Sequence, residues 1–143
     1  MVTDHIQFKP EDLEEFYGTT EYYVLPPFRN LVYTDGIQYL AKHYEMYWLI
    51  TDIAIFLPKV LKLYPDSFYC IILKQTAAGQ AELIFTNGNS EKSIFSYKYD
   101  YANFEFIGCH RNSTPIQEMR LFLQQTQDKR EKVCYCLMLP SEY

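Results

Sequence analysis

The chain has 143 residues, enough for one domain with its own hydrophobic core, and 48% of them are hydrophobic. Its net charge of −5 comes from residues 1–21, so residues 22–143 are neutral overall and lack the basic surface that nucleic-acid-binding proteins need. The longest apolar stretch, Met46 to Leu57, is too short to span a bilayer. We therefore predict a single domain, residues 1–143, with neither a nucleic-acid partner nor a membrane anchor.

Residues 1–21 form an acidic N-terminal extension. Pro10 is followed by acidic residues, which predicts a short helix over about residues 10–17. The ordinary interpretation is a solvated helix face, and the alternative is a docking surface for a basic partner. The polar start is not typical of a signal peptide, and we expect a cytoplasmic protein.

Helical signals follow over residues 31–64. A turn with Thr34 or Asp35 as N-cap precedes apolar residues at helical spacing. A second helix, apolar nearly all round, is predicted from Tyr47 until Pro58 ends or kinks it, with one more turn after the proline.

The apolar period then changes to that of strands over residues 67–139. Residues 115–125 fit a strand or a helix, and Gln124 to Lys132 suits a long hairpin loop. The other predicted strands are Phe68–Lys74, Ala81–Thr86, Ser93–Tyr101, Phe104–Cys109 and Val133–Leu139.

The last predicted strand, Val133–Leu139, is apolar on both faces, which predicts a central position or cover on both sides. Helices followed by strands indicate an α+β fold. We expect N-terminal helices packed on one face of an antiparallel β-meander of about five strands. The 14 tyrosines suggest a thin core, in which rings are buried and hydroxyls reach the surface.

Four cysteines lie in or beside the predicted strands, and we expect free, buried thiols. A metal site from Cys134, Cys136 and the pair Cys109-His110 is the alternative. Cysteines two residues apart on a strand are poorly spaced for one metal ion, so no metal and no cofactor is predicted.

Catalytic signals are weak. The three histidines lie apart from any nucleophile motif, so we predict no catalytic residue and favour a non-enzymatic protein. Asp52 stands out as a carboxylate in an apolar helix. It is either a structural acceptor, for example for a tyrosine hydroxyl, or an acid with a raised pKa in a pocket beside Trp48.

Four aromatic residues alternate along one predicted strand: Phe95, Tyr97, Tyr99 and Tyr101. Such a row either packs under a helix or stacks on the bases of single-stranded nucleic acid. The neutral charge of residues 22–143 favours packing.

The segments Tyr33-Thr34-Asp35-Gly36, Tyr39-Leu40-Ala41 and Tyr47-Trp48-Leu49, with Asp52, and the ending Leu137 to Tyr143 resemble the DUF6876 family of small bacterial proteins, seen especially in cyanobacteria and on mobile elements. The resemblance covers about residues 16–143. The extension, the Gln124 to Lys132 loop and about Phe104 to Ser113 depart from it. It implies no activity, but it raises interest in the residues that the family pattern shares: Asp35, Trp48, Asp52 and Ser141-Glu142-Tyr143.

Two functions remain open. The first is a binding module that acts on a protein partner or on a second copy of itself. The second is a small enzyme or small-molecule binder with a cleft around Asp35, Trp48 and Asp52. The Glu142 carboxylate is expected to bond tyrosine hydroxyls or the turn at residues 33–36, or to dock a partner. The candidate binding residues are Tyr33, Asp35, Trp48, Asp52, Glu142 and Tyr143.

Overall fold

The computed structural model describes residues 6–8, 22–77, 80–87, 92–100, 104–106, 110–111, 114–115, 118–127 and 132–143. Its helices are α1 (Asp35–His43) and α2 (Tyr47–Leu63), followed near the C-terminus by a 3-10 turn at Pro140–Glu142. The main sheet is built from β2 (Leu31–Tyr33), β3 (Phe68–Ala77), β4 (Gln80–Asn87), β5 (Ser93–Tyr99), β9 (Glu118–Gln127) and β10 (Val133–Met138).

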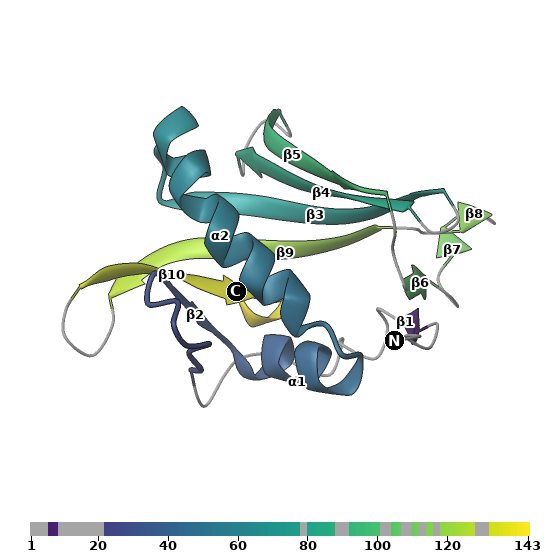
Figure 1. The fold of residues 1–143 in the computed structure, drawn as a ribbon, viewed down its shortest axis with the longest axis horizontal. Coiled ribbons are helices and arrows are strands. Elements are labelled where there is room, and N and C mark those ends of the chain that lie inside the picture. Colours follow the sequence, from purple (N-terminus) through teal and green to yellow (C-terminus); the bar gives the residue numbers. More distant parts are fainter. Residues whose placement is uncertain are drawn as a thin grey trace.

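The six strands lie in the order β2-β10-β9-β3-β4-β5, and α2 crosses one face of this sheet (Figure 1). All neighbours are antiparallel except β2 and β10, which are parallel. Two short pairs lie outside the sheet: β1 (Ile6–Phe8) with β6 (Phe104–Phe106), and β7 (His110–Arg111) with β8 (Thr114–Pro115).

The α+β class is confirmed, but the sheet is not a five-stranded antiparallel meander. It has six strands and is mixed, because Leu31–Tyr33 forms β2 where the helical part was expected to begin. Three residues are too few to show a strand period. Their partner, β10, lies about a hundred residues later in the chain.

β10 lies between β2 and β9, as its two apolar faces predict. Tyr135 and Leu137 point into the core beneath the helices, whereas Cys134, Cys136 and Met138 are buried on the other face. The prediction of an interior strand is therefore confirmed.

The ambiguous stretch at residues 115–125 is resolved for its described part, because β9 covers Glu118–Gln127. The first residues of the predicted loop Gln124 to Lys132 therefore belong to a strand. The acidic helix at residues 10–17, Tyr101 and Cys109 lie outside the described residues.

Pro58 does not end α2, which continues to Leu63 as the extra turn predicted. A proline has no N–H, so it leaves the carbonyl four residues earlier, that of Ala54, without its helical donor. The side chain of Asn30 fills this gap, since its Nδ2 donates to the Ala54 carbonyl at 3.1 Å. The residue that precedes β2 thus ties that edge of the sheet to α2.

A double-mutant cycle tests this link. Asn30→Ala should lower the free energy of unfolding by about 1–3 kcal/mol, because the Ala54 carbonyl loses its donor. In a Pro58→Ala background the loss should shrink, because the new backbone N–H can bond the same carbonyl. Urea denaturation measures both values, and an equal loss in the two backgrounds would contradict the assignment.

Candidate functional site

The carboxylate of Glu142 binds the start of α1. Its Oε1 accepts hydrogen bonds from the Thr34 hydroxyl at 2.5 Å and from the Leu139 backbone N–H at 3.0 Å, and its Oε2 accepts from the Gly36 N–H at 3.1 Å. The first N–H groups of a helix lack partners within the helix and favour negative charge. The chain therefore caps α1 with a carboxylate from its C-terminal segment.

Gly36 leaves room for this contact, because a side chain there would push the Leu139 and Glu142 side chains away. A Cβ atom there would lie 2.4 Å from the Leu139 Cδ1 and 2.6 Å from the Glu142 Oε1, both too close. Two segments named by the sequence analysis, the turn at residues 33–36 and the C-terminal segment, thus meet directly.

Tyr143, at the end of this segment, takes no part in the Glu142 contact and packs elsewhere. Its ring makes edge contacts with Phe68 at 5.5 Å and Phe122 at 5.6 Å between centroids. It remains 70% exposed, so it covers these two rings only in part.

Asp35 and Tyr33 lie in a second contact at the same end of the molecule. The Tyr23 hydroxyl donates to the Asp35 Oδ1 at 3.1 Å, and the Tyr23 ring stacks on the Tyr33 ring at 5.6 Å. Backbone hydrogen bonds between Tyr23 and Tyr33 hold the pair together. Asp35 thus fastens the segment that precedes β2 to α1.

Asp52 accepts a hydrogen bond from the Tyr99 hydroxyl at 2.5 Å, and the Trp48 ring packs edge-on against the Tyr99 ring at 5.4 Å. Burial, reinforced by the Asp52 carboxylate, raises the pKa of Tyr99 far above its ordinary value, so its hydroxyl stays protonated and donates. This is the contact that the structural interpretation of Asp52 predicts. Tyr99 is on β5 and Asp35 follows β2, at the opposite edge of the sheet, so these contacts form two separate groups.

The aromatic row on β5 packs against α2, as its sequence context favours. Phe56 lies 5.2 Å from Phe95 and 5.0 Å from Tyr97 between ring centroids. Phe95 and Tyr99 are partly buried against the core. Within the described residues, this row is part of the helix–sheet interface.

The described cysteines, Cys70, Cys134 and Cys136, are buried thiols, as predicted. Burial, followed by the nearby Glu142 carboxylate and Cys134, raises the pKa of Cys136 to about 12. A thiol this weakly acidic is a poor nucleophile or metal ligand near neutral pH. The side chains of Cys109 and His110, the other members of the metal alternative, lie outside the described residues.

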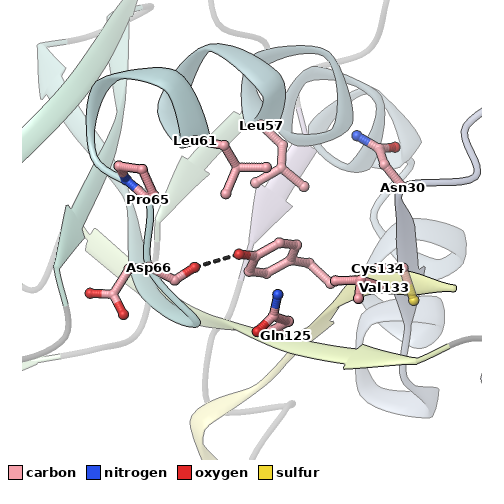
Figure 2. A pocket seen from close by; sticks show the side chains of 9 residues that line it. Asn30, Leu57, Leu61, Pro65, Asp66, Gln125, Val133 and Cys134 are labelled. Atoms are coloured by element: carbon pink, nitrogen blue, oxygen red, sulfur yellow. Dashed lines mark hydrogen bonds between the residues drawn. The ribbon is translucent and has the colours of Figure 1, made fainter.

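A cavity of about 410 Å³ lies beneath the C-terminal half of α2 (Figure 2). Its walls come from α2, the loop to β3, the residue before β2, and the adjoining ends of β9 and β10. The lining residues are Asn30, Leu57, Leu61, Pro65, Asp66, Gln125, Val133, Cys134 and Tyr135. The sequence analysis missed this site, because the lining residues come from separate segments and share no motif.

Two tyrosines from the sheet hold one wall of the cavity in place. The Tyr135 hydroxyl donates to the Asp66 carbonyl (Figure 2). The Tyr69 hydroxyl donates to the Tyr64 carbonyl at 2.6 Å and accepts from the Asp66 N–H at 2.8 Å. Burial raises the pKa of Tyr69 to about 12 and also raises that of Tyr135. The loop that follows α2 is therefore fixed rather than loosely attached.

Comparison with known proteins gives a family but no activity. The model of a family of unknown function, DUF6876, matches residues 7–143, which includes most of the acidic extension. No curated protein matches the chain. A solved structure, "the protein of unknown function from Enterococcus faecalis", is similar with 15% identity and a TM-score of 0.44, over 84% of this chain and 98% of that one.

The contact of Glu142 with Thr34, Gly36 and Leu139, which we call the Glu142 clamp, predicts a specific loss of stability. Glu142→Gln removes the charge and replaces one of the two acceptor oxygens by an amide nitrogen, which can only donate, so the donors on that side, either Gly36 or the pair Thr34 and Leu139, lose their acceptor. The change should lower the free energy of unfolding by about 1–3 kcal/mol. The neighbouring exposed change Ser141→Ala should stay within about 0.5 kcal/mol. Chemical denaturation measures both, and equal effects would show that the carboxylate adds little.

The raised tyrosine pKa values predict alkaline instability. Tyr69 ionises near pH 10 when unfolded and only near pH 12 in the fold, so its contribution to stability is complete below pH 10 and is lost between pH 10 and 12. Urea denaturation at pH 8, 10 and 11 should show this fall. It should be smaller in Tyr69→Phe and unchanged in Tyr22→Phe, whose ring is 64% exposed.

Proposed function

The chain belongs to the DUF6876 family, a family of unknown function, and on that premise we propose that it is a non-enzymatic module that binds another protein. The binding surface is the mouth of the cavity beneath α2, which we define as Leu61, Pro65, Gln125 and Val133. A cytoplasmic location and an origin from bacterial mobile elements remain predictions from the sequence.

The proposal rests on the observation that apolar residues in the cavity wall are also exposed to solvent. Val133 is 60% exposed, Pro65 is exposed and Leu61 is half-buried, and all three line the cavity. Exposed apolar side chains are common singly. Grouped around a hollow with apolar walls, they are typical of surfaces that receive a side chain of a partner protein.

The chemistry of the lining supports binding rather than catalysis. The polar side chains among the nine described lining residues are two amides, a carboxylate, a tyrosine hydroxyl and a thiol. The hydroxyl of Tyr135 is engaged by Asp66, and Cys134 is 2% exposed. A nucleophile needs a base beside it. The nine lining residues include neither a histidine nor a lysine, and their one carboxylate, that of Asp66, already accepts from the Ser67 N–H.

The alternative, a small-molecule binder near Asp52, has one observation in its favour. A second cavity, of about 360 Å³, is lined by Tyr99, the partner of Asp52, and by Glu82, Lys98 and Asp100. In this alternative the ligand would contact Tyr99. Asp35 would play no part, because it lies with Tyr23 at the other edge of the sheet.

Affinity capture from the organism that encodes the protein tests the proposal. The tagged wild-type chain should retain a specific protein that Val133→Asp loses, because a carboxylate at the cavity mouth disfavours an apolar anchor. Ile55→Asp is the matched control, since Ile55 is 53% exposed on α2 and does not line the cavity. Quantitative mass spectrometry reads the outcome, with circular dichroism to confirm folding.

Retention of the same protein by a folded Val133→Asp variant would contradict the proposal. So would a wild-type chain that retains nothing beyond the tag alone. Equal losses in Val133→Asp and Ile55→Asp would place the binding surface elsewhere.

A further inference from the structure

We propose that the partner segment received by the cavity mouth is an acidic peptide that carries one large apolar side chain. This inference rests on the proposed function and specifies its partner. Two features of the described residues carry it: the charges beside the lining residues, and the shape and chemistry of the cavity.

Basic residues adjoin the lining residues in the sequence. Three exposed basic residues are each next in the chain to a lining residue: Arg29 beside Asn30, Lys62 beside Leu61 and Lys132 beside Val133. The lining itself holds one carboxylate, that of Asp66, whose Oδ1 already accepts from the Ser67 N–H at 2.7 Å. Residues 22–143 are neutral overall, so this excess of positive charge is a local feature.

The walls select an apolar anchor. Leu57, Leu61 and Val133 present aliphatic carbons to a volume of about 410 Å³, which accommodates a leucine or phenylalanine side chain. Apolar anchors in pockets supply most of the affinity of many protein interfaces, whereas charges at the rim set specificity and the rate of association. An acidic segment with one such anchor matches both the apolar walls and the basic residues that adjoin them in the chain.

The amides at the edge suit an extended peptide backbone. Asn30 donates its Nδ2 to Ala54, so its Oδ1, which has no partner among the described residues, can accept a peptide N–H. Gln125, exposed on β9 at the opposite side of the cavity, can donate and accept (Figure 2). These two side chains would bond a backbone without selecting its sequence.

Peptide binding by the full chain tests the inference. The probe is a short fluorescein-labelled peptide with one phenylalanine flanked by glutamates, and its control has lysines in place of the glutamates. Fluorescence anisotropy should show tighter binding of the acidic peptide, weakening as salt is added. The double variant Arg29→Glu/Lys62→Glu should weaken it roughly tenfold.

Lys42→Glu is the matched control for charge. Lys42 is an exposed cation at the end of α1, whereas the cavity lies under the far end of α2. This variant should bind the acidic peptide like the wild type. Circular dichroism of every variant establishes that the fold is kept.

The inference would be overturned by no binding of the acidic peptide, by equal affinity for the two peptides, or by equal effects of the double variant and of Lys42→Glu. Tighter binding of an oligonucleotide of the same charge would also overturn it, in favour of a phosphate backbone. If the captured partner is lost in Val133→Asp but kept in the double variant, the inference fails while the proposed function stands.

Discussion

The structure depends on the pairing of β10 with a strand at each of its two edges. β9 pairs with one edge in antiparallel, and β2, from much earlier in the chain, pairs in parallel with Tyr135–Leu137 at the other edge. Parallel strands end at the same edge of a sheet. The exit of β2 into α1 therefore lies beside the exit of β10 into the C-terminal segment, which allows Glu142 to cap α1. The clamp is thus a consequence of the parallel pairing.

Where irregular geometry leaves a backbone carbonyl without a backbone hydrogen-bond partner, a side chain from a distant segment donates to it. The proline in α2 frees the Ala54 carbonyl, and Asn30 bonds it. The loop after α2 exposes the Tyr64 and Asp66 carbonyls, and Tyr69 and Tyr135 bond them from the sheet. Tyrosine suits this role, because a ring buried between sheet and helix can carry its hydroxyl to a polar group at the rim of the core.

Local patterns revealed most of the fold in advance. The sequence predicted α1, α2 and the long strands from their apolar periods, and the position of β10 from its two apolar faces. Each of these signals depends only on neighbouring residues. The parallel β2–β10 pair was not predicted, since three residues show no period and pairing over a hundred residues leaves no local trace. The turn at residues 33–36 was expected as one partner of Glu142, and a tyrosine hydroxyl as one partner of Asp52, and the structure shows both contacts. The sequence did not identify Tyr99 as that tyrosine, because it lies on a distant strand. The sequence did not predict the cavity, because a cavity lined by residues from several separate segments has no sequence motif.

The candidate residues and the cavity differ in how completely the chain uses their chemistry. Glu142 receives three hydrogen bonds, and Asp35 and Asp52 each receive a tyrosine hydroxyl, so these carboxylates stabilise contacts within the chain. At the cavity mouth, Val133 and Pro65 are exposed although apolar, and they lie beside a hollow with apolar walls. A partner that covered this surface would remove apolar area from water, which makes the cavity mouth the stronger basis for the proposed binding.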